Sequence, residues 1–196
     1  MKFKWLNVFV FLLISCFTGN YSASGSTIPD QPEIDSLILA SKKASTPKDK
    51  ISTLFELSKS YKDASELNLA LATNARLIEI ISKHGTKSDS AKYFRLAGLI
   101  YLKMAGYDKS LENLMMSQQL YAESGDTLLQ ARALMNIGIV HDNLGNKPMS
   151  LSYYNKALNY FKLINDEGGM ADCELNIAII LTQQNEYEKA CENLIS

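Results

Sequence analysis

The apolar positions of this chain repeat with a period of 40 residues. Within one period they are three or four positions apart, which is the spacing of one face of an α-helix. Two columns show the longer period most clearly: Leu57, Ala97, Ile137, Ile177, and Tyr61, Tyr101, His141, Leu181. A regular period of this length indicates a chain built from stacked copies of one small unit.

Two further columns hold only small residues. They are Ser58, Gly98, Gly138, Ala178, and, twelve positions later, Ala70, Ser110, Ser150, Ala190. Two helices approach each other closely where the side chains at their crossing are small. Each repeat is therefore predicted to be a pair of antiparallel helices that cross at these columns.

Residues with known preferences for helix ends delimit the predicted helices. Thr46 is suited to the N-cap position before a helix over Pro47–Asp63, and Gly85 is suited to the end of a second helix over Leu67–Lys83. An opening helix is predicted within residues 33–45, from the helical spacing of its apolar residues. Repeats are then predicted to start near residues 51, 91, 131 and 171, the last of them incomplete.

The first residues have the three-part pattern of an export signal. Lys2 and Lys4 precede an apolar run from Leu6 to Phe17, and the small residues Ser22-Ala23-Ser24 follow. This run is shorter than the ~20 residues that a membrane-spanning helix needs. Residues 1–24 are predicted to be a signal peptide and residues 25–32 a linker, so the protein is expected in the periplasm or elsewhere in the cell envelope.

A second interpretation of this segment stays open. Leu13-Ile14-Ser15-Cys16 resembles a bacterial lipobox, in which the cysteine carries a lipid and becomes the mature N-terminus. Phe17, directly after the cysteine, is unusual for that pattern. On this alternative the protein is a lipoprotein scaffold anchored in the membrane through Cys16.

Charge and motif content argue against several classes of function. The chain has 20 basic and 21 acidic residues, so it lacks the basic excess typical of nucleic-acid binders. It has no Gly-rich phosphate loop, no Gly-x-Ser-x-Gly, no His-Glu-x-x-His and no Cys-x-x-Cys. His84 and His141 are not paired by spacing, and His141 occupies the tyrosine column of a helix. We expect no catalytic residues, no metal site and no cofactor.

The repeats resemble those of the tetratricopeptide family. The small columns, Leu134-Met135-Asn136-Ile137-Gly138 and Tyr187-Glu188-Lys189-Ala190 carry the resemblance. The family's usual unit is about 34 residues long; units of 40 are similar to those in sensor regions of bacterial signalling proteins. The resemblance implies an all-α solenoid over residues 33–196, a right-handed superhelix whose concave groove binds a protein or peptide. Asn74, Lys147 and Glu174 depart from the family pattern, which has aromatic or apolar residues there.

A second flank of the first helix in each repeat is also apolar and carries scattered basic and amide groups. In the resembling family this flank lines the concave groove, so its residues are the candidate binding residues: Lys92, Arg95, Leu99, Arg132, Met135, Asn136, Ile139, Asn143, Leu175, Asn176 and Ile179. Two alternatives stay open. Neighbouring first helices can simply contact each other along this flank, and the asparagines can bond a neighbouring helix.

The last predicted repeat leads to two further expectations. Cys173 and Cys191 lie at opposite ends of an antiparallel pair, too far apart for the ~7 Å limit of a disulfide. The chain is expected to stop inside the last helix, either as the N-terminal part of a longer signalling protein or with a partner covering the end. Membrane contact is then expected only through a lipid anchor or a missing C-terminal region, and the uncapped repeat favours self-association.

Overall fold

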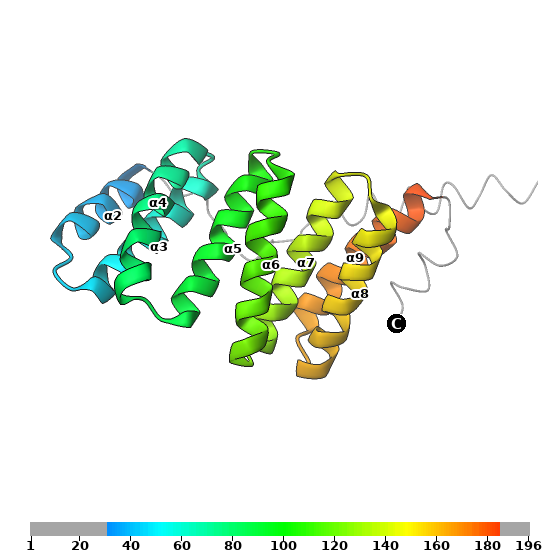
Figure 1. The fold of residues 1–196 in the computed structure, drawn as a ribbon. Coiled ribbons are helices and arrows are strands. Elements are labelled where there is room, and N and C mark those ends of the chain that lie inside the picture. Colours follow the sequence, from blue (N-terminus) through cyan, green and yellow to red (C-terminus); the bar gives the residue numbers. More distant parts are fainter. Residues whose placement is uncertain (1–30, 185–196) are drawn as a thin grey trace, which may run out of the picture.

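The computed structural model describes residues 31–184, and this part of the chain is a row of packed helices (Figure 1). The helices are α2 (Gln31–Lys43), α3 (Pro47–Asp63), α4 (Leu67–His84), α5 (Lys87–Lys103), α6 (Tyr107–Ser124), α7 (Thr127–Asn143), α8 (Lys147–Ile164) and α9 (Glu167–Gln183). The predicted bounds of α3 are confirmed, and those of α2 and α4 differ by one or two residues. Cys16, the proposed signal segment and the second helix of the last repeat lie outside the described residues.

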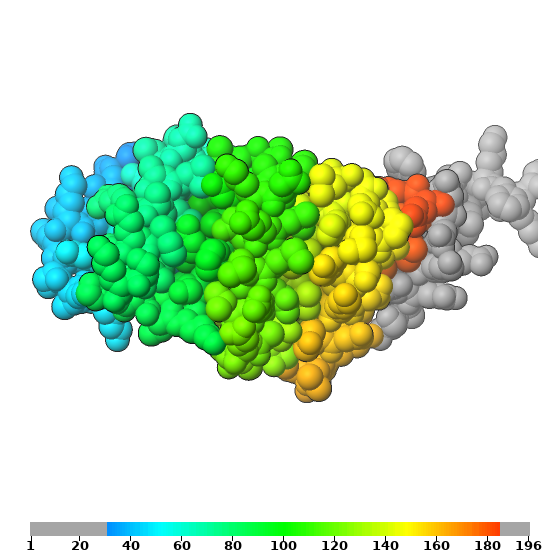
Figure 2. Space-filling view, in the orientation of Figure 1, coloured from blue at the N-terminus to red at the C-terminus, as the bar shows by residue number. Residues whose placement is uncertain are grey.

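The helices form antiparallel pairs that stack into a solenoid. We call α3, α5, α7 and α9 the A helices and α2, α4, α6 and α8 the B helices, according to their place in the 40-residue repeat. Each helix packs on the next one in the chain, and successive A helices also contact each other, α3 with α5 and α5 with α7. Within residues 31–184 no two B helices are comparably close, so the A helices lie on the inner side of the curved row. Figure 2 shows the resulting elongated body.

Local signals explain where the helices begin and end. The Thr46 hydroxyl accepts a hydrogen bond from the Asp49 backbone N–H at 3.1 Å, as predicted for an N-cap. Thr86 and Asp89 form a reciprocal capping box at the start of α5. Asn165 ends α8 in the left-handed conformation with φ 54°, which asparagine tolerates better than most residues. Short turns with such caps let each helix reverse direction within three residues or fewer.

The small columns lie at the helix crossings, as predicted. Ser58, Ser110 and Ser150 are completely buried. A Cβ atom added to Gly138 would lie 2.7 Å from the ring of Tyr154, and one added to Gly98 would lie 2.6 Å from Leu114. The large side chain on the B helix therefore occupies the space that the glycine on the A helix leaves open.

The three departures from the repeat pattern have different consequences. Asn74 takes the place of Leu114 and Tyr154 and is just as buried, but its amide oxygen has no hydrogen-bond partner. Lys147 is half-buried and forms an ion pair with Asp142. Glu174 is half-buried beside Cys173. The fold tolerates all three because the neighbouring repeats supply the remaining apolar contacts.

None of the helices in residues 31–184 is both long enough and apolar enough to be a candidate membrane span.

Candidate functional site

The predicted groove lies on the inner row of A helices, where equivalent residues of successive repeats follow one another. The apolar members are half-buried in the middle of the array and exposed at its end. Leu99, Met135 and Ile139 are half-buried, whereas Leu175 and Ile179 are 54% and 44% exposed. Met135 and Ile139 pack against the core cluster that α7, α8 and α9 share. Contact between neighbouring A helices therefore accounts for part of this flank, and the surface on α9 remains open. We call Leu99, Ile139, Leu175 and Ile179 the inner flank.

Two of the predicted cations lie on open surface. Lys92 and Arg132 occupy the same position in successive repeats, near the start of α5 and of α7. Both are exposed, and within residues 31–184 neither takes part in an ion pair or hydrogen bond. Their charges are available to an acidic group beside the inner flank.

Arg95 does not belong with these two cations. It is half-buried, and its guanidinium lies beside the hydroxyl of Tyr121 on α6. Burial raises the pKa of Tyr121, and the nearby positive charge of Arg95 opposes part of that shift. Arg95 thus lies against α6 with only part of its side chain exposed, and its role as a groove cation stays a prediction.

The asparagines do not act together. Asn136 is only 8% exposed, and the equivalent residue in α5 is the core residue Leu96. Asn136 is among the buried residues of α7, so its predicted place on the open flank is wrong. Asn143 donates to the Ile139 carbonyl and Asn176 to the Asp172 carbonyl, both at 2.8 Å. These bonds lie within one helix, so neither amide uses them to bond a neighbouring helix.

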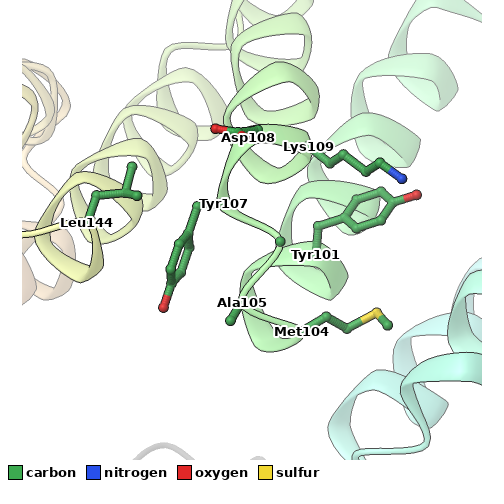
Figure 3. A pocket seen from close by; sticks show the side chains of 8 residues that line it. Tyr101, Met104, Ala105, Tyr107, Asp108, Lys109 and Leu144 are labelled. Atoms are coloured by element: carbon green, nitrogen blue, oxygen red, sulfur yellow. The ribbon is translucent and has the colours of Figure 1, made fainter.

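A surface pocket that the sequence did not reveal lies at the turn between α5 and α6 (Figure 3). Its volume is about 510 Å³, and it is lined by Tyr101, Met104, Ala105, Gly106, Tyr107, Asp108, Lys109 and Leu144. The Lys109 ammonium lies 5.3 Å from the centre of the Tyr101 ring, a cation–π contact. The exposed apolar residues Met104 and Leu144 sit in equivalent turns of successive repeats, and that spacing is the one signal in the sequence that could have located the pocket.

Two titratable side chains with shifted pKa values, His141 and Cys173, are packed within the described helices. The ring of His141 stacks on that of Tyr153 with 5.3 Å between centroids, and burial lowers the pKa of this histidine. Cys173 is fully buried, and burial raises the pKa of its thiol to about 12, so the reactive thiolate is not accessible. No cluster of three or more metal-ligating side chains occurs among the described residues. Cys191 lies outside them, so the predicted lack of a disulfide stays a prediction.

A family model described as soluble NSF attachment protein, SNAP, matches residues 39–194. The chain belongs to the SNAP family. The match covers the helical repeats and begins within α2. Helical repeats of this family and of the tetratricopeptide type are typically non-catalytic scaffolds. No curated protein sequence matches this SNAP-family chain.

Several solved structures have a similar fold. Aspartyl phosphate phosphatase F from Bacillus subtilis is 17% identical with a TM-score of 0.75, covering 82% of this chain and 41% of that protein. Rap protein complexed with Competence and Sporulation Factor is 17% identical with a TM-score of 0.74, covering 82% and 46%. A signal transduction ATPase from Pyrococcus horikoshii, which has a tetratricopeptide repeat sensor, is 19% identical with a TM-score of 0.74, covering 82% and 25%. This SNAP-family chain thus spans less than half the length of these three proteins.

Proposed function

We propose that this SNAP-family chain is a non-enzymatic module that binds a protein or peptide segment along the inner flank. The observation that carries the proposal is the exposure of Leu175 and Ile179 on α9, at positions where α7 is half-covered by its neighbour. Exposed apolar side chains that line up on one face mark an interaction surface. Lys92 and Arg132 beside this flank favour a segment that combines apolar and acidic side chains.

The relatives support the same kind of role. The matching family takes its name from attachment to another protein, NSF. One similar structure is a Rap protein complexed with Competence and Sporulation Factor, and another contains a tetratricopeptide repeat sensor. We propose that this chain is the sensor portion of a longer bacterial signalling protein whose effector lies outside these residues. The partial coverage of such proteins, 46% and 25%, supports this proposal.

Selection from a displayed peptide library tests the inner flank. The wild-type protein should enrich peptides with apolar residues next to acidic ones, and the variant Leu175→Glu/Ile179→Glu should lose this enrichment. The matched control is Met115→Glu, which changes a similarly exposed residue on the B helix α6. Circular dichroism checks that each variant is folded. If the folded double variant enriches the same peptides as the wild type, the inner flank is not the binding surface.

The location of the protein is a separate part of the proposal. The charged start, apolar run and small residues of the first 24 positions favour export to the cell envelope. N-terminal sequencing of the mature protein should then start near Gly25. An alternative product that starts at a lipid-modified Cys16, and that Cys16→Ser releases from the membrane fraction, would indicate the anchored scaffold. A product that retains Met1 would contradict both.

Immunoblotting for a product much larger than 21.8 kDa tests the sensor role.

A further inference from the structure

One edge of the solenoid, distinct from the inner flank, is basic in one half and acidic in the other. This turn edge consists of the turns α2/α3, α4/α5, α6/α7 and α8/α9, where B helices end and A helices begin. The last three of these turns lie along the lower side of Figure 1. The ion pair between Lys87 at the start of α5 and Glu123 near the end of α6, at 2.8 Å, shows that the two kinds of helix end meet at this edge.

The N-terminal half of the turn edge is basic. The α2/α3 turn has exposed Lys42, Lys43, Lys48 and Lys50 against one acidic residue, Asp49. The α4/α5 turn adds Lys83, Lys87 and Lys92 against Glu79 and Asp89, so its excess of positive charge is smaller. Between these two turns lies a hollow of about 260 Å³, lined by Pro47, Lys50, Glu79, Ile80, Lys83 and His84, in which two lysines outnumber one carboxylate.

The C-terminal half of the same edge is acidic. The α6/α7 turn has Asp126 and the Lys87-paired Glu123 against Arg132, and the α8/α9 turn has Asp166, Glu167 and Asp172 against Lys162. The sign of the charge therefore reverses along the edge, near the middle of the stacked helices. A uniformly anionic partner such as a lipid surface would attract one half of this edge and repel the other.

We propose that the turn edge pairs with the turn edge of a second copy of this chain, in antiparallel orientation. A two-fold axis that reverses the stacking direction brings the basic α2/α3 turn opposite the acidic α8/α9 turn of the second copy, and the α4/α5 turn opposite its α6/α7 turn. Each favourable contact then occurs twice. The same edge is self-complementary only in this orientation, since the parallel arrangement would bring like charges together.

Exposed leucines at the two ends of the turn edge fit the same arrangement. Leu39 on α2 is 52% exposed, and Leu163 on α8 is 73% exposed. Position 163 comes three 40-residue repeats after position 43. Position 43 is four residues, or about one helical turn, after Leu39, so both leucines lie on the same face of their B helices. The proposed two-fold axis keeps B helices against B helices and brings Leu39 close to Leu163 of the second copy.

Sedimentation equilibrium of the purified protein tests the pairing. The wild type should be a dimer at low ionic strength, and its dissociation constant should rise with added salt because salt screens exposed charges. Lys50→Glu and Glu167→Lys should each weaken the dimer by about tenfold or more, since each reversal places like charges together twice. Arg76→Glu, the same charge change in the middle of α4, is the matched control and should leave the dissociation constant unchanged.

Restoring the charge pairing decides the result. A single chain carrying both Lys50→Glu and Glu167→Lys should dimerise again, and an equimolar mixture of the two single variants should form a mixed dimer. A folded wild-type protein that stays monomeric at low ionic strength overturns the proposal. So does a monomer that binds vesicles of anionic lipid through Lys50, which would assign the basic half to a membrane surface. Failure of the double variant to recover, with its circular dichroism spectrum intact, would also overturn it.

Discussion

The hydroxyl of Ser150 on α8 donates a hydrogen bond of 2.9 Å to the carbonyl oxygen of Gly138 on α7. Ser110 makes the equivalent bond to Gly98 one repeat earlier, at 2.8 Å. In the first repeat the direction is reversed, because Ser58 on the A helix donates to the carbonyl of Ala70 on the B helix, at 3.0 Å. The twelve-residue spacing of the small columns thus joins the two helices of the first three repeats by a buried hydrogen bond as well as by close packing.

Replacing Ser150 with alanine should lower the free energy of unfolding by about 1 kcal/mol, the usual net value of a buried hydrogen bond. Ser152→Ala on the exposed side of α8 is the control, and it should be neutral or slightly stabilising because alanine favours helix. Urea denaturation of the two variants makes the comparison. Equal stabilities for both would show that the Ser150 hydrogen bond contributes nothing to the pairing of α7 and α8.

Replacing Gly138 with alanine should destabilise the protein although alanine is the better helix former. The added methyl group would lie 2.7 Å from the Tyr154 ring, and overpacking of this kind costs about 1–3 kcal/mol. Gly168→Ala is the matched control, because the nearest atom to its added Cβ is 3.6 Å away. Thermal and urea denaturation should show a loss for Gly138→Ala alone. A gain at both positions would contradict the close approach of α7 and α8.

His141 should make stability depend on pH between neutral and mildly acidic values. Its pKa in the folded protein is lowered by burial, so the unfolded chain binds the proton more readily. The stability that the neutral His141 side chain contributes is fully present above its ordinary pKa of about 6.5. It is lost as the pH falls through the lower pKa that His141 has in the folded protein. His141→Tyr, which restores the residue found at positions 61 and 101, should reduce the change in melting temperature between pH 7.5 and pH 5.5. An unchanged pH profile would contradict this prediction.

Cys173 should resist thiol reagents in the folded protein. Its thiol is fully buried, and burial raises its pKa to about 12, so little thiolate forms at neutral pH. In a Cys16→Ser/Cys191→Ser background, Ellman's reagent should label less than one tenth as fast without denaturant as in 6 M urea, because labelling then requires opening of the α7–α9 core. Rapid labelling of the folded protein would show that this core opens readily.

The sequence by itself determined the repeat and the helices. The 40-residue period, the small columns and the capping residues predicted helix bounds that agree with the structure to within two residues at α2, α3 and α4. These features depend on near neighbours in the chain and on a regular spacing, and both can be read without knowing the packing. The likeness to tetratricopeptide structures follows from the same pattern, because any sequence with such columns must stack its helix pairs.

Only the tertiary structure decided which flank residues face outward. Asn136 and Arg95 lie on the predicted flank by helical projection, yet one is buried and the other lies against Tyr121. Tyr121 is on a different helix, 26 residues after Arg95, so no local pattern records that contact. The same holds for the turn edge, since its charges are scattered over 130 positions and gather on one side only after the helices have stacked. Spacing along the chain determines the elements, whereas the crossing and curvature of the packed helices determine the surface.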